Sequence, residues 1–154
     1  MNKQPNNELL YKVGLGLIPK LGPNIYKKII RNCGSAEAFF NMPRGKLERI
    51  QGVGPKLLAY RNQKAKYLSE AEALIDTAVQ HKIQIHCFME ENYPTRLKSL
   101  PDGPPVLYSK GELTLNPKRT IGIVGTRKAT DYGKNITQQI IEELSRFQPT
   151  IISG

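Results

Sequence analysis

The chain has 154 residues, 39% of them apolar and 23% charged, and its formal net charge is +10. This composition is typical of one or two globular domains, and the lack of an apolar run of about 18 residues excludes a membrane span. Two cysteines, Cys33 and Cys87, are too few for a disulfide scaffold. The apolar stretch 13–18 is too short for a secretory signal, so we expect a cytoplasmic protein with no membrane partner.

Positive charge is concentrated in the first half of the chain. Residues 1–80 carry 13 Lys and Arg against 6 Asp and Glu, whereas residues 81–154 carry 10 against 7. Segment 20–66 holds 11 basic residues but only two acidic ones. Such a density attracts phosphate groups. It is equally typical of a solvated helical face, so charge alone leaves nucleic-acid binding open.

Apolar periodicity predicts an all-helical domain over residues 1–80. The expected helices span 7–17, 23–32, a short segment capped by Ser35, a short segment from Pro43, and 55–80 as one long helix. The buried stripe of the long helix is expected to contain Leu58, Ala65, Leu68, Ile75 and Val79.

A sequence pattern occurs twice in this domain, 32 residues apart. Residues 18–25 and 50–57 share Ile-x-x-(Leu/Val)-Gly-Pro-x-(Ile/Leu). We expect Gly22 and Gly54 to supply the positive φ of a tight turn, after which proline begins the next helix. The pattern is that of a helix-hairpin-helix.

The second hairpin is the better candidate for phosphate binding. Gly52 and Gly54 would let backbone N–H groups approach a phosphate, and Lys56 adds a cation. Contacts of this kind would not read the base sequence. The first hairpin is a weaker match because Lys20 stands where the second has Gly52. The alternatives are a turn that only packs helices, or a protein-docking module.

The second half begins with a strand expected over 82–89, which places the domain boundary near residue 81. The prolines between residues 94 and 105 are expected to exclude a helix there. Residues 105–111 then predict a short strand and a turn.

The last third of the chain predicts a strand–helix–strand unit. A strand is expected over 120–124, a helix over 134–147 and a second strand over 150–153. Such units build parallel sheets, which bind ligands beyond the carboxyl ends of their strands. Gly125-Thr126-Arg127 occupies that position and offers backbone, hydroxyl and guanidinium groups to a phosphate. It is neither a dinucleotide fingerprint nor a P-loop, and the alternative is an ordinary turn with a surface arginine.

Several segments together resemble the DNA-processing protein A (DprA/Smf) family in order and spacing. They are Tyr93-Pro94, 105–111, 123–127, Tyr132-Gly133 and 151–154, preceded by a helical repeat that resembles the family's N-terminal SAM-like domain. The resemblance implies an α/β protein: a helix-hairpin-helix domain (1–80), then the first part of an extended Rossmann-like parallel sheet (81–154). Because the family continues past this point, the chain is expected to be an N-terminal fragment.

The resemblance also implies a function. Family members are bacterial proteins that bind single-stranded DNA and usually form homodimers. They protect incoming DNA and help load the RecA recombinase during natural transformation and recombination. The pocket for the DNA backbone would contain Gly125, Thr126, Arg127, Tyr132, Gly133, Ser153 and Gly154.

No catalytic constellation or cofactor motif is evident. His81, His86 and Cys87 lack a fourth metal ligand at usable spacing, so no metal is expected. There is no Gly-x-Ser-x-Gly elbow. A non-enzymatic protein without cofactors is therefore expected. The alternative is a Rossmann-like enzyme that binds or hydrolyses nucleotides.

Overall fold

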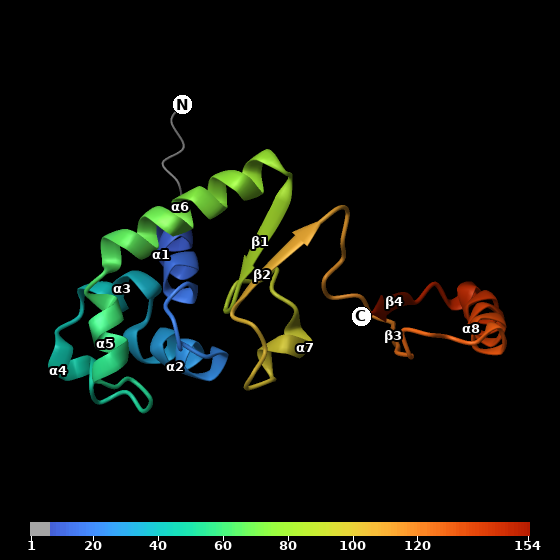
Figure 1. The fold of residues 1–154 in the computed structure, drawn as a ribbon, viewed down its shortest axis with the longest axis horizontal. Helices are drawn as coiled ribbons and strands as arrows, with labels where there is room; N and C mark the ends of the chain where they lie inside the picture. The colour runs from blue at the N-terminus through green and yellow to red at the C-terminus, as the bar shows by residue number, and fades with distance from the viewer. Residues whose placement is uncertain (1–6) are drawn as a thin grey trace. The chain divides into compact units, whose positions relative to one another are not determined.

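The computed structural model describes residues 7–154 and divides the chain into two compact units, one ending at Leu113 and the other spanning Thr114–Gly154 (Figure 1). Both contain helices and strands, in agreement with the α/β class that the sequence predicts. The first unit contains α1 (Asn7–Gly16), α2 (Pro23–Cys33), α3 (Ala36–Asn41), α4 (Arg44–Leu47), α5 (Pro55–Arg61), α6 (Lys64–Gln80), β1 (Ile83–Cys87), α7 (Thr95–Lys98) and β2 (Val106–Lys110). The second contains β3 (Thr120–Ile123), α8 (Asp131–Leu144), the 3₁₀ turn η1 (Ser145–Phe147) and β4 (Thr150–Ser153).

The helices of the first unit enclose an apolar core. The Ser35 hydroxyl accepts the Ala38 N–H, so this residue caps α3 as predicted. The rings of Tyr11 and Phe40 lie 5.7 Å apart, which joins α1 to α3. The largest fully buried side chains of the core include Tyr26, Phe39, Leu15, Ile29 and Leu47.

The long helix expected over 55–80 is interrupted at Asn62 and Gln63, where α5 ends and α6 begins. The predicted stripe is confirmed at Leu58, which is buried, and at Leu68, which packs against the core. It is wrong at Ala65, which is exposed, and at Val79, which is 72% exposed. Gly14 explains the packing of α6, since a Cβ there would lie 3.3 Å from the Tyr67 carbonyl. Glycine therefore lets α1 and α6 approach closely. The residues that α6 buries are Tyr67, Ala71 and Ala78.

β1 and β2 form an antiparallel pair that belongs to the first unit. The compact units divide near residue 113, because this pair contacts α1 and β1 contacts α6. The expectation that prolines exclude a helix between the strands is wrong for one turn. Pro94 precedes α7 and its carbonyl accepts the Leu97 N–H at 3.0 Å. A proline at a helix start gives up no hydrogen bond.

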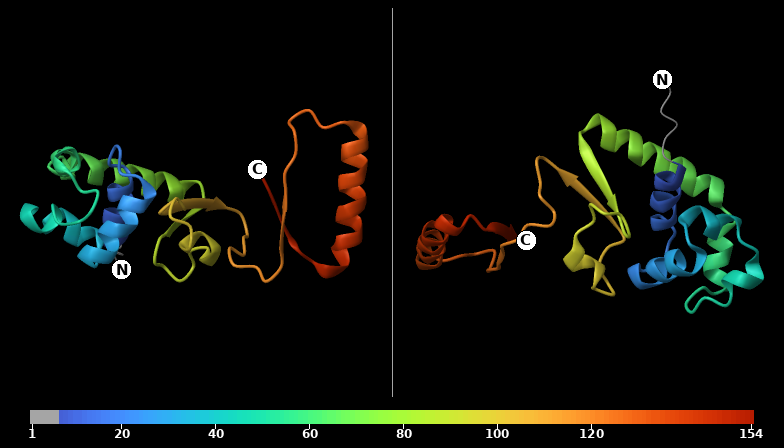
Figure 2. Two further views of the ribbon diagram at one scale, coloured as in Figure 1. Left: turned by 90° about the horizontal axis from the view of Figure 1, so that it is seen from below. Right: turned by 180° about the vertical axis from the view of Figure 1, so that it is seen from behind.

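β3 and β4 are parallel, and α8 connects them as the sequence predicts (Figure 2). The helix begins at Asp131, three residues earlier than expected. The reason is Thr130, whose hydroxyl accepts the Gly133 N–H at 3.1 Å and caps the helix.

Candidate nucleic-acid interface

The two strands of the second unit end at the same edge of their sheet. In the parallel register Ile123 pairs with Ser153, so the chain leaves both strands side by side. The loop containing Gly125, Thr126 and Arg127 follows β3 directly, and Gly154 follows β4. The structure therefore brings these two predicted segments together at the carboxyl edge, where parallel sheets bind ligands.

The loop after β3 leaves room for a ligand. A Cβ on Gly125 would meet no atom within 4 Å, so the fold does not require glycine there. The Thr126 hydroxyl accepts the Lys128 N–H at 3.3 Å. Within residues 7–154, no hydrogen bond or ion pair fixes the exposed Arg127 guanidinium. This cation remains available to an anion.

The first turn of α8 carries the other two predicted residues of this pocket. Tyr132 is 76% exposed, whereas the Gly133 N–H is engaged by the Thr130 cap. Asp131 brings a carboxylate to the same turn, but Lys134 pairs with it at 3.1 Å. The Tyr132 ring and the Asp131–Lys134 ion pair therefore follow the loop 125–127 closely in sequence.

The two sequence repeats of the first unit form the same turn. Leu21 N–H donates to the Ile18 carbonyl at 3.2 Å, and in the second repeat Val53 N–H donates to Ile50 at 2.9 Å. The proline after each turn begins a helix, α2 or α5, as predicted.

The glycines of the repeat do not have the predicted conformation. Gly22 and Gly54 have φ of −68° and −104° and precede α2 and α5 as extended N-cap residues. The positive φ lies two positions earlier, at Lys20 (64°) and Gly52 (97°). Lys20 therefore has the backbone conformation of its glycine counterpart, and the first hairpin is a closer match than the sequence indicates.

Some of the basic residues of segment 20–66 stabilise the fold instead of facing a ligand. Lys27 is only 3% exposed, and its amine donates to the Leu100 carbonyl at 2.6 Å. Burial, together with the positive charge of Arg31, lowers the pKa of Lys27. Arg61 donates to the carbonyls of Phe39 and Phe40. Fewer basic side chains of segment 20–66 are therefore available at the surface than the sequence indicates.

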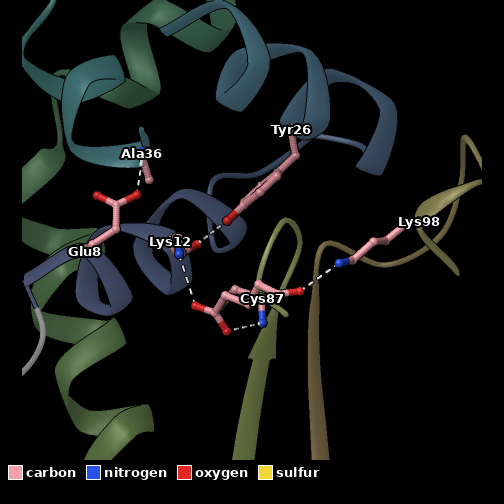
Figure 3. A network of polar contacts seen from close by, with 7 residues as sticks. Glu8, Lys12, Tyr26, Ala36, Cys87 and Lys98 are labelled. Atoms are coloured by element: carbon pink, nitrogen blue, oxygen red, sulfur yellow. Dashed lines mark hydrogen bonds and ion pairs between the residues drawn. The ribbon is translucent and has the colours of Figure 1, made fainter. Parts of the chain in front are cut away.

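A polar network holds the segment after β1 against α1 (Figure 3). Lys12 pairs with the Glu90 carboxylate at 3.0 Å, and the same carboxylate accepts the Cys87 N–H at 3.1 Å. Burial raises the pKa of the Cys87 thiol to about 12, with a further contribution from Glu90. Buried His86 contacts the Ser109 hydroxyl at 2.7 Å. These residues have structural roles.

No three His, Cys, Asp or Glu side chains in the described part of the chain gather where they would hold a metal ion. None of the helices between residues 7 and 154 is long and apolar enough to cross a membrane.

Comparison with known proteins finds sequence similarity that covers the end of the first unit and all of the second. Residues 84–154 match the family of DNA recombination-mediator protein A. The chain is 35% identical over 100 residues to the DNA processing protein DprA of Bacillus subtilis, which covers 64% of this chain and 34% of that protein. It is 28% identical over 153 residues to the protein Smf of a Synechocystis species, which covers 97% and 38%. The chain spans between a third and two fifths of the length of these relatives, and over the matched residues it is similar to the DNA-processing protein A (DprA/Smf) family.

Proposed function

We propose that this chain binds single-stranded DNA as part of a DNA-processing protein that helps load the RecA recombinase during natural transformation and recombination. Binding, without catalysis or a cofactor, would be its contribution. Similarity to proteins named DprA and Smf supports a role in DNA processing. The net charge of +10 supports an anionic partner.

The observation that carries the proposal is the common edge of β3 and β4. The exposed guanidinium of Arg127 and the open backbone at Gly125 follow one strand, and Ser153 ends the other. A phosphate at this edge would receive a forked cation and nearby hydroxyl groups. Tyr132 would offer a ring to a neighbouring base.

The fold assignments belong to the same proposal. The unit β3–α8–β4 would be the beginning of an extended Rossmann-like sheet, and residues 1–80 a helix-hairpin-helix domain. In the cytoplasm the full protein would act as a homodimer. At the second hairpin, Gly52, Gly54 and Lys56 would contact phosphates.

The test is fluorescence anisotropy of labelled oligo(dT), single-stranded and duplex, titrated with the chain at several salt concentrations. We expect stronger binding of the single strand and a steep loss of affinity with salt, because cations on the protein release counterions from phosphates. Arg127→Ala should weaken binding by about 1–3 kcal/mol and reduce the salt slope by about one.

The matched control is Arg146→Ala. Arg146 lies in η1, beyond the opposite end of α8, and stacks on the adjacent Phe147 ring. Its loss removes the same charge from the same unit. Equal effects of the two substitutions would contradict the assignment of the pocket. Release of a free base from a nucleoside monophosphate would favour the nucleotide-hydrolysing alternative instead.

A further inference from the structure

The two hairpins of the first unit enclose a hollow of about 480 Å³. This volume lies within the range of small-molecule sites. The wall is mainly apolar and includes residues from both repeats. Prominent among them are Lys20 and Ile25 of the first hairpin, Gly52, Lys56 and Leu57 of the second, and Tyr60 of α5.

Because Gly52 has no side chain, its backbone lies close to Ile25 and forms one side of the hollow. A Cβ on Gly52 would lie 3.1 Å from Cγ1 of Ile25, and its φ of 97° disfavours any other residue. The second turn therefore packs directly on the first turn of α2. Equivalent positions of the two repeats line the hollow twice: Lys20 matches Gly52, and Ile25 matches Leu57. The repeat thus builds one site from two turns.

The chemistry of the wall combines apolar surface with two cations. Lys20 and Lys56 come from different hairpins, and both are exposed. Neither amine has a hydrogen bond or ion pair to any residue of the described chain. No acidic side chain lines this hollow within residues 7–154. Nearby, Lys28 donates to the Gln51 side chain at 2.8 Å, so its charge is not neutralised by a carboxylate.

We infer that this hollow receives one unstacked base of a single DNA strand, with the flanking phosphates at Lys20 and Lys56. A base is planar and apolar on its faces, which suits Ile25, Leu57 and the ring of Tyr60. Its phosphates suit the two exposed amines and a wall in which none of the described lining residues is acidic. The inference rests on the proposed binding of single strands. To the phosphate contacts proposed at the second hairpin it adds a base site between the two hairpins and a phosphate contact at Lys20.

The experiment compares two labelled oligomers of equal length and charge: oligo(dT) and its abasic counterpart, which keeps the sugar–phosphate backbone. The full chain is titrated with each. Tyr60→Leu should weaken oligo(dT) binding about fivefold or more, the lower end of what a stacked base contributes, and leave the abasic oligomer unaffected. Lys20→Ala and Lys56→Ala should weaken both oligomers.

Lys66→Ala is the matched control for charge. Lys66 lies on α6, outside the hollow, within 4.0 Å of Glu70, and its loss should change affinity less than that of Lys20 or Lys56. Circular dichroism confirms that each variant folds. If Tyr60→Leu fails to fold, photocrosslinking of the unaltered chain to an oligomer containing 5-iodo-deoxyuridine replaces it, and the crosslinked peptide should contain Tyr60.

The outcomes separate this site from the edge of the sheet. If Tyr60→Leu has no effect on binding, or if the crosslink forms at Tyr132 alone, the hollow is not a base site. If Arg127→Ala still weakens binding in that case, the proposed function is unaffected. Equal affinity for both oligomers overturns the base contact in favour of phosphates alone. Competition by poly-glutamate as strong as by oligo(dT) would indicate a protein-docking surface. Absence of binding to either oligomer overturns both proposals.

Discussion

Lys12 on α1 and Glu90, beyond the end of β1, form an ion pair of 3.0 Å although 78 residues separate them in sequence. The other oxygen of the carboxylate accepts the Cys87 N–H, and the Glu90 carbonyl accepts the Lys98 amine at 2.8 Å. Figure 3 shows the contacts converging from α1, the end of β1 and α7. One residue thus ties the strand pair to the helices.

Replacing Glu90 by alanine should destabilise the first unit. Both side chains of the pair are mostly buried, at 16% and 29% exposure, and the loss leaves the Lys12 amine and the Cys87 N–H without their acceptor. We expect a loss of about 1–3 kcal/mol in the free energy of unfolding, measured in urea. The control is Glu48→Ala, which removes an exposed pair with Arg44 at 2.8 Å and should cost less than about 0.5 kcal/mol. Equal losses would contradict the structural role of Glu90.

Stability should fall in alkaline solution. The pKa of Cys87 is about 12 in the folded chain and about 8.5 in an unfolded one. Between these values the unfolded thiol loses its proton while the folded thiol keeps it, so stability is lost as the pH rises, by at most about 1.4 kcal/mol per pH unit. Burial also raises the pKa of Tyr26 and Tyr93, which extends the trend.

Cys87→Ala isolates the contribution of this thiol. Urea denaturation at pH 8, 9 and 10 should give a shallower loss of stability in the variant than in the unaltered chain, even though the variant begins from a lower value. Parallel curves would show that Cys87 is not the group responsible.

Two glycines allow a comparison between fold and site. A Cβ on Gly103 would lie 2.5 Å from the Leu97 carbonyl, whereas one on Gly125 would meet nothing. Gly103→Ala should therefore destabilise the chain by about 1–3 kcal/mol. Gly125→Ala should leave thermal unfolding unchanged but weaken oligo(dT) binding, because the methyl group stands where a phosphate would approach. A Gly125→Ala variant that binds normally would show that the DNA does not contact this backbone.

Much of the architecture follows from local signals in the sequence. Three signals predict helices and strands correctly because each acts through neighbouring residues. They are the proline at the start of α2 and α5, Ser35 before α3, and the alternation of strand and helix after residue 120. The break after Arg61 could not be predicted in this way. Beyond the break, α6 packs against Gly14 of α1, a contact between residues more than fifty positions apart that local signals do not encode.

The candidate sites show the same division. The edge formed by Arg127 and Ser153 could be predicted, because parallel strands must end together once the connecting helix is recognised. The hollow between the hairpins could not, because it depends on the approach of Gly52 to Ile25. One signal was present in the sequence: Lys20 occupies the position of a glycine in an otherwise matching repeat.

Lys20 should lower the stability of the fold while strengthening DNA binding. Its φ of 64° is left-handed, a conformation that costs a residue with a Cβ about 1–2 kcal/mol, whereas its counterpart in the second repeat is Gly52. Lys20→Gly should therefore stabilise the chain by up to about 1 kcal/mol, after the greater entropy of glycine in the unfolded chain is subtracted. The same substitution removes one of the two cations of the hollow and should weaken oligo(dT) binding.

Lys20→Ala serves as the comparison, since it loses the cation but keeps the backbone strain. Thermal unfolding should show higher stability for Lys20→Gly but not for Lys20→Ala. Fluorescence anisotropy should show weaker oligo(dT) binding for both variants. If Lys20→Gly instead bound as well as the unaltered chain, a lysine at this position would have no role in DNA binding.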